Sequence, residues 1–248
     1  KGYATFDYQA LIVTGLNANG FDRNNWVAGG KQGFFEVDNF TSPAYVARLD
    51  NRGVPGLRIG GSFYYCVNTA SNSDKVATYA GVKAPLRIYT VDGQYKNKYV
   101  TARTNFVFGN LTGATAISNK NKGLSNSSPY TRVVQVAKKA VSYAGEVGVN
   151  LRSICNGNKK VPVIYPFARY EYYNPQEAGE KAQLPMDKRN QVSMWTAVLN
   201  WYALPNLVVK ADYMTRQIGT GKVFGKGKYN SENEFSIGIA YVGWFIKK

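Results

Sequence analysis

Histidine is absent from this chain of 248 residues, which also has only two cysteines and three methionines. The lack of histidine removes the commonest acid–base group at neutral pH and the commonest metal ligand. Cys66 and Cys155 lie too far apart in the sequence to form a zinc cluster by themselves. We therefore expect no metal, no other cofactor and no histidine-based catalysis.

Long apolar runs are also missing. No stretch approaches the roughly 18 consecutive apolar residues that a membrane-spanning helix requires. A helical crossing of the bilayer is thereby excluded, whereas a crossing by a β-barrel stays open. The chain begins with KGYATFDY, without an initiator methionine or an apolar leader. We expect either that a signal peptide has been removed or that the chain is a segment of a longer one.

Acidic residues are few, since 15 Asp and Glu stand against 31 Lys and Arg, for a net charge of +16. Such an excess indicates an anionic partner, which is nucleic acid, lipid headgroups or a small anion. Aromatic residues, in contrast, reach 14%, with 19 Tyr, and Gly contributes 25 residues. This composition favours strands and turns over helices, so we predict an all-β fold.

Ten segments alternate between apolar and polar residues with a period of two, which is typical of β-strands. They cover residues 4–13, 44–50, 56–66, 86–95, 99–108, 141–150, 163–173, 191–201, 207–216 and 233–248. The connections between them alternate between long and short, as in NRGVPG (51–56) and ALPN (203–206). This rhythm predicts antiparallel hairpins with short turns at one end and extended loops at the other.

A soluble β-sandwich would also show alternating strands, and charges in the middle of the polar face fit both architectures. Strands of about ten residues with an apolar band match the roughly 9–11 residues that a tilted strand needs to cross a bilayer. Aromatic residues near strand ends resemble interfacial girdles: Tyr64, Tyr65, Tyr99, Tyr172, Tyr173, Trp195, Trp201, Tyr202, Trp244 and Phe245. We therefore predict one domain over residues 1–248, an antiparallel transmembrane β-barrel of about ten strands with long external loops and short periplasmic turns. It stands alone or forms the C-terminal part of a larger barrel.

In this topology the polar side chains line a lumen. The lumen-facing candidates are Arg48, Arg58, Arg103, Arg169, Lys210, Arg216, Glu146 and Glu171. Together with Asp7, Asp92 and Asp212 they give a nearly balanced charge, so most of the positive excess belongs to loops and turns. Lys222, Lys226 and Lys228 are predicted at the external mouth, where a positive field concentrates anions.

Catalytic and nucleic-acid interpretations are weaker. Glu146 with Glu171 would suit a paired-carboxylate hydrolase, but lumen carboxylates next to Arg169 or Arg103 are usually structural. The stretch GTGKVFGKGK (219–228) does not fit the phosphate-binding loop motif, and no nucleic-acid-binding module is recognisable. We therefore expect no enzyme and no nucleic-acid partner.

The two cysteines are predicted to be unpaired. Cys66 ends an ascending strand near the external rim, whereas Cys155 follows a descending strand at the periplasmic end. A bilayer core of about 30 Å separates these ends, and a disulfide requires Cα atoms within roughly 7 Å. We also expect an impermeant thiol reagent, applied to whole cells, to reach Cys66, if it is exposed, before Cys155.

Several segments resemble outer-membrane porins of Bacteroidota that are related to the phosphate-selective porin O and P family. They are YPFARYEYYNP (165–175), KRNQVSMWTAVLNWYALPNLVVKADY (188–213), NSENEFSIGIAYVGWF (230–245) and ARLDNRGVPGLRIGGSFYY (47–65). The resemblance implies a passive channel for small anions, typically a sixteen-stranded trimer with basic residues at its constriction. Ten strands are fewer than that architecture has.

These observations predict a channel in the bacterial cell outer membrane for small, preferentially anionic solutes. Its partners would be membrane lipid and lipopolysaccharide, small anions, and either copies of itself or other subunits of an outer-membrane complex. A structural or partner barrel that conducts nothing is the main alternative, and an outer-membrane enzyme is the third.

Overall fold

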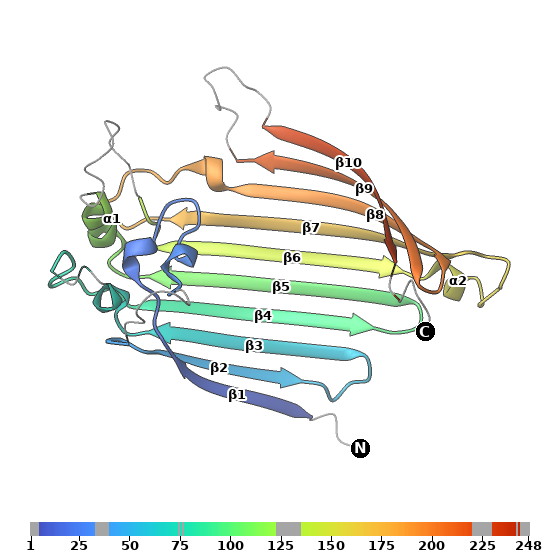
Figure 1. Cartoon of the computed structure of the whole chain (residues 1–248), viewed down its shortest axis with the longest axis horizontal. Helices are drawn as coiled ribbons and strands as arrows, with labels where there is room; N and C mark the ends of the chain where they lie inside the picture. The colour runs from blue at the N-terminus through green and yellow to red at the C-terminus, as the bar shows by residue number, and fades with distance from the viewer. Residues whose placement is uncertain are drawn as a thin grey trace.

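The computed structural model describes residues 5–32, 40–73, 75, 77–122, 135–219, 230–241 and 243. In this part of the chain ten strands form one antiparallel sheet whose order, β1 to β10, follows the sequence (Figure 1). The strands are β1 Phe6–Val13, β2 Ala44–Asn51, β3 Leu57–Cys66, β4 Leu86–Lys96, β5 Val100–Leu111, β6 Lys139–Val149, β7 Val163–Ala178, β8 Val192–Leu204, β9 Leu207–Ile218 and β10 Ser231–Tyr241. The predicted all-β class and all ten predicted strands are confirmed.

The connections separate into two ends of the sheet, as the sequence predicts. The short turns after β2, β4 and β8 lie at one end, together with the helix α2 (Leu151–Ile154) between β6 and β7. Gly56, in the turn after β2, has a φ of +78°, and a Cβ atom there would lie 2.2 Å from the carbonyl oxygen of Lys96. This tight turn therefore requires glycine. The long connections lie at the opposite end, which we call the mouth end.

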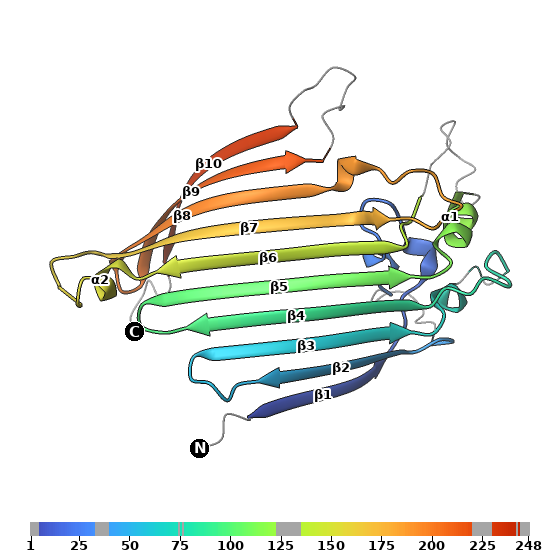
Figure 2. The ribbon, with the colours of Figure 1, turned by 180° about the vertical axis from the view of Figure 1, so that it is seen from behind.

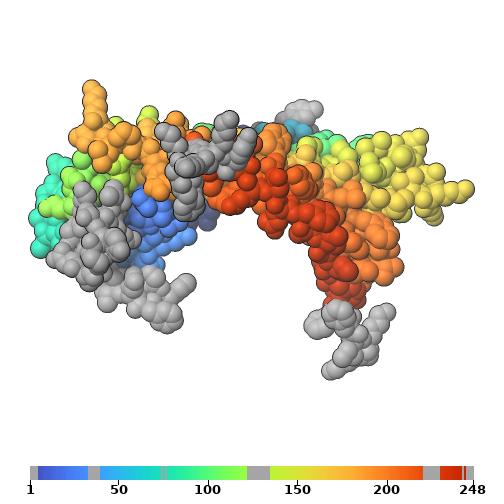
Figure 3. Space-filling model, turned by 90° about the horizontal axis from the view of Figure 1, so that it is seen from above, coloured from blue at the N-terminus to red at the C-terminus, as the bar shows by residue number. Residues whose placement is uncertain are grey.

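The sheet is bent into an arch, as Figure 3 shows, and it is open. Within the described residues β1 pairs only with β2, and β10 pairs only with β9. A closed barrel is therefore not present in these ten strands by themselves. The two unpaired edges lie on opposite sides of the sheet (Figure 1).

The register divides the sheet into two chemically different faces, because directly opposed residues of antiparallel strands point to the same side. One row of opposed residues runs from β5 to β10: Arg103, Glu146, Arg169, Thr196, Met214 and Glu234. This polar face is the hollow side of the arch, on which residues 14–32 lie (Figures 1 and 3). The opposite, outer face carries the apolar members of each alternation.

The hydrophobic core lies at the mouth end rather than between two layers of sheet. It is built from the long connections and the adjoining strand ends, and it includes Phe21, Trp26, Leu86, Leu111 and Ile117. The connections contain the helix α1 (Ala114–Lys122) and the short 3-10 helices η1 (Ala18–Gly20), η2 (Ala28–Gly30), η3 (Thr69–Asn72) and η4 (Lys188–Asn190). The sequence predicted extended loops here, because these apolar residues follow no period of two or 3.6.

Glu180 joins two of these connections. Its carboxylate accepts hydrogen bonds from the backbone N–H groups of Gly113 and Thr115, both at 2.9 Å, and from the Thr115 hydroxyl at 2.6 Å. It thereby caps the first turn of α1 from the connection between β7 and β8. Partial burial alone would raise the pKa of Glu180, but these hydrogen bonds outweigh it and lower the pKa below the usual 4.5.

We expect Glu180→Gln to lower the free energy of unfolding by about 1–3 kcal/mol at pH 7, because hydrogen bonds to a charged acceptor are lost. A lowered pKa in the folded state stabilises the protein above the unfolded pKa, near 4.5, and this contribution disappears as the pH falls through the folded value. Denaturant unfolding at pH 7 and at progressively lower pH should therefore show a difference that shrinks with acidification. The exposed neighbour Lys181 provides the control, Lys181→Gln; equal stability of Glu180→Gln and the parent at pH 7 would contradict this role.

Within the described residues, no helix has both the length and the apolar character needed to span a membrane.

Candidate functional site

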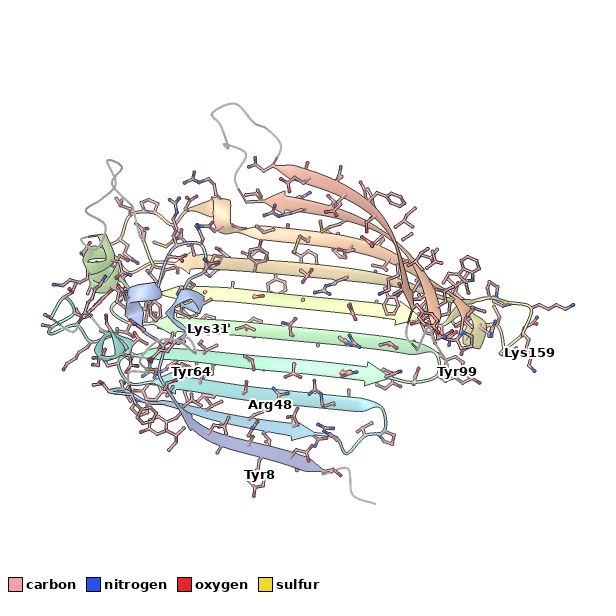
Figure 4. All side chains as sticks on the ribbon, in the orientation of Figure 1. Tyr8, Lys31, Arg48, Tyr64, Tyr99 and Lys159 are labelled. Carbon is pink, nitrogen blue, oxygen red and sulfur yellow. The ribbon has the colours of Figure 1, made fainter. Side chains whose placement is uncertain are left out.

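Charged side chains gather on the hollow face in the middle of β2 to β7. We call this set the charged belt: Arg48, Asp50, Arg58, Asp92, Arg103, Glu146, Arg169 and Glu171. Figure 4 shows Arg48 over the central part of the sheet, far from Tyr99 and Lys159 at the turn end. The residues of the charged belt share one face because alternate residues of a strand point to the same side, and the register aligns them from one strand to the next.

The first half of the charged belt, on β2 to β4, is tightly paired. Arg48 donates to Asp50 at 2.7 Å and to Asp92 at 2.8 Å, and Arg58 donates to Asp92 at 2.8 Å. Gly60 provides the room for this cluster, since a Cβ atom there would lie 2.4 Å from both the Arg48 Nη2 and the Asp50 Oδ1 atoms. These arginines are therefore held in place by carboxylates on their own and neighbouring strands.

The second half, on β5 to β7, is looser. Glu146 lies 3.7 Å from Arg103 and 3.7 Å from Arg169, while Arg169 donates to Glu171 at 2.5 Å. The Arg103 side chain is 63% exposed, the most accessible guanidinium of the charged belt. Arg103 is thus the member best placed to meet a dissolved anion.

An open depression of about 270 Å³ lies between the two halves. Its lining includes Arg58, Asp92, Gln94, Arg103, Asn105, Glu146 and Arg169. Charged and amide groups on these walls can exchange hydrogen bonds with a hydrated solute. Both signs of charge are present, so the depression by itself does not select strongly for anions.

Glu146 and Glu171, the pair considered for hydrolysis, are both contacted by Arg169. This bridging arrangement is that of a structural ion-pair cluster. Among the described residues, no group of three or more Cys, Asp or Glu side chains is arranged to hold a metal ion.

The remaining lumen candidates, Lys210 and Arg216, also lie on the hollow face, on β9. Arg216 donates to Glu232 at 2.9 Å across the β9–β10 pair. The sequence-based charge count omitted three acidic residues that the register places on this face: Asp50, Glu232 and Glu234. With them included, the hollow face has no excess of positive charge in its strands. Lys222, Lys226 and Lys228 lie outside the described residues.

The outer face is mainly apolar on the ten strands and carries large exposed side chains, while Arg87 and Lys139 lie on it near the mouth end. Tyr8 is 87% exposed, Ile239 73% and Trp195 59%. Seen from behind in Figure 2, no other described element crosses this face. It therefore lacks the second layer that would bury it in a soluble sandwich.

Of the aromatic residues predicted to form a girdle, some face outward and others do not. Tyr65, Tyr172 and Trp195 face outward near the mouth end, and Trp201 faces outward near the turn end. Tyr64 and Tyr173 instead face the hollow, because each is directly adjacent in its strand to an outward residue, Tyr65 and Tyr172 respectively. The Tyr64 hydroxyl accepts a hydrogen bond from the Leu16 N–H at 3.2 Å, so it belongs to the core at the mouth end. Tyr202 also lies on the hollow side, opposite Val208, while Trp244 and Phe245 are outside the described residues.

Cys66 and Cys155 are both free, which confirms that they do not form a disulfide. The expected earlier labelling of Cys66 depended on its exposure, and that condition is not met. Cys66 is fully buried beneath the long connections, near Ser42 and Asn72, whereas Cys155 is exposed. The sequence places Cys66 at the rim correctly but does not reveal that the connections fold over it.

No protein-family model matches the chain, and no curated protein is significantly similar to it. The functional assignment therefore rests on the two faces of the sheet and on the charged belt.

Proposed function

We propose that this chain forms the wall of a β-barrel in the bacterial outer membrane, and that the barrel is a passive channel for small, preferentially anionic solutes. The supporting observation is the division of one ten-stranded sheet into an apolar outer face and a polar hollow face. Lipid would cover the outer face, and water would fill the hollow.

Strand length agrees with this proposal. The strands contain between 8 and 16 residues, and seven of the ten contain ten to thirteen. A tilted strand needs about 9–11 residues to cross the hydrocarbon core. The short turns would then lie in the periplasm, and the mouth end would face outside, in contact with lipopolysaccharide.

The preference for anions rests on the overall charge of +16, together with the neutral or slightly acidic strands of the hollow face. The positive excess belongs to connections, where it would attract anions to the entrances. The resemblance to porins of the phosphate-selective O and P family points in the same direction and stays a prediction.

Closure of the barrel requires partners for β1 and β10. These two strands run in opposite directions because nine successive antiparallel pairings separate them. Direct pairing of the two edges, or insertion of an even number of antiparallel strands, would complete an antiparallel barrel. Extra strands would come from further polypeptide, from another copy or from another subunit, and the open edges also support the alternative of a non-conducting barrel in a larger outer-membrane complex.

Planar-bilayer recordings test the channel proposal. We expect the protein purified from outer membranes to give discrete conductance steps, with reversal potentials in a salt gradient that are biased towards anions. A folded protein with heat-modifiable electrophoretic mobility that gives no steps would contradict the channel and favour the structural barrel. Conductance steps biased towards cations would agree with a channel but contradict the proposed preference for anions.

A further inference from the structure

Residues 14–32 lie within the hollow of the sheet rather than beside the edge strand from which they emerge. We call them the mouth segment. Figure 1 shows it in blue, in front of the ends of β5 and β6, although it directly follows β1. The Trp26 ring packs on Gly109 of β5, whose side of the strand also bears Arg103 and Asn105. The segment thus lies on the polar, hollow face.

Contacts from distant parts of the chain fix the mouth segment across the hollow. The Leu16 N–H donates to Tyr64 of β3 at 3.2 Å. The Asn121 amide, on α1, donates to the carbonyl oxygens of Phe21 at 3.0 Å and Ala18 at 3.2 Å. The Asn190 amide, at the end of η4, donates to the carbonyl oxygen of Arg23 at 3.2 Å. Tyr64 lies on β3, Asn121 on α1 after β5, and Asn190 on η4 before β8. The segment therefore reaches across the sheet and does not follow a single strand.

Trp26 is the principal anchor. It is 7% exposed, and its indole N–H donates to the carbonyl oxygen of Ala137 at 2.8 Å. A Cβ atom on Gly109 would lie 1.9 Å from the indole ring, so the ring occupies the space that a side chain would take. The backbone of Trp26 has a φ of 53°, a left-handed conformation that is unfavourable for a bulky residue. Its burial and hydrogen bond offset this strain.

The mouth segment and the charged belt lie at different depths. Gly109 follows Arg103 by six residues on the same face of β5, which corresponds to about 20 Å along the strand. The exposed side chains around Trp26 include the amides of Asn24 and Asn25. A solute entering at the mouth end would therefore meet an amide-bearing, anchored segment first and the charged belt afterwards.

We propose that the mouth segment is a fixed constriction that selects solutes by size, with Trp26 as the residue that positions it. This inference rests on the proposed channel function. It assigns selection by size to the mouth segment and selection by charge to residues elsewhere, so the two properties should change independently.

The most direct test removes the segment. The Asn17 N–H donates to the carbonyl oxygen of Gly30 at 2.8 Å, so these two positions are adjacent and residues 18–29 can be replaced by two glycines. Two milder variants detach the anchor. Trp26→Ala removes the indole ring, and Gly109→Val places a side chain in the space that the ring occupies. Trp195→Ala is the matched control, because this tryptophan is 59% exposed on the outer face.

The measurements are single-channel conductance and the largest neutral polyethylene glycol that enters from the mouth end. We expect the deletion and both anchor variants to raise the conductance and to shift the size limit towards larger polymers. Trp26→Phe should restore part of the original limit, and the anion-to-cation permeability ratio should not change. Folded variants with the original size limit would overturn the constriction.

A labelling experiment separates this inference from the channel proposal. Asn105→Cys, in a Cys155→Ser background, places a thiol on the hollow face below the mouth segment. In outer-membrane vesicles, the deletion should increase the rate of labelling by a large maleimide much more than that by a small one. If the wild type does not conduct but this difference appears, the channel proposal fails and the constriction remains. Equal acceleration for both reagents, or none, would overturn the constriction.

Discussion

Reversing the charge of Arg103 and Arg169 together is expected to convert the proposed channel from a preference for anions to a preference for cations. Each substitution by glutamate changes the local charge by two units, and both sites flank the depression of about 270 Å³. Glu146 would then lose both of its basic neighbours. Reversal potentials in a salt gradient should change sign, at low and at high salt alike if the closed lumen is narrow at the belt, because charges in a narrow lumen are only weakly screened.

The double variant should still fold. Arg103 is 63% exposed and Arg169 45%, and exposed ion pairs contribute about 0–1 kcal/mol. Arg103→Gln with Arg169→Gln provides the neutral comparison and should give an intermediate shift. A third variant, with Lys222, Lys226 and Lys228 changed to glutamate, separates the belt from the predicted external mouth. If the mouth position is correct, its effect should fade at high salt, since charges in water act over about 8 Å at physiological ionic strength. If neither set shifts the reversal potential, the anion preference has no electrostatic basis.

The strands could be predicted from the sequence because a period of two is a local property. Arg48 and Asp50 illustrate both the success and its limit. Their spacing of two places them on one face, yet the contact of Arg48 with Asp92 depends on the register of β2, β3 and β4. Once the register is known, every lumen candidate falls on the hollow face. The sequence pattern could therefore indicate which charged residues share a face and can pair, but it could not give the distances between them.

The mouth end could not be predicted, because its contacts join residues that are far apart in sequence and follow no period. The Trp26 ring packs on Gly109, and its indole N–H donates to the carbonyl oxygen of Ala137, which lies 111 residues further along the chain. The same folding explains why Cys66 is buried. Closure presents a different limit: alternation specifies the two faces of each strand but leaves the partners of β1 and β10 unspecified.

Replacing Ile237 by arginine is expected to have the largest effect on assembly. Ile237 lies near the middle of β10 on the outer face, opposite Ala211, and is 68% exposed. If lipid covers this face, an arginine near the bilayer midplane costs about 2–4 kcal/mol. In a soluble protein the same exposed position would tolerate the change within about 0.5 kcal/mol, and the added charge would aid solubility.

The adjacent residue supplies the matched control. Ser236 faces the hollow opposite Asp212, so Ser236→Arg places the same side chain on the same strand but towards water and a carboxylate. Folding into lipid vesicles, followed by urea titration, should show a large loss of stability for Ile237→Arg and little for Ser236→Arg. Val91→Arg, in the middle of β4 and 53% exposed on the outer face, should repeat the loss far from the sheet edge. Equal stability of the outer-face and hollow-face variants would exclude lipid from the outer face, and the membrane assignment of all ten strands would fall with it.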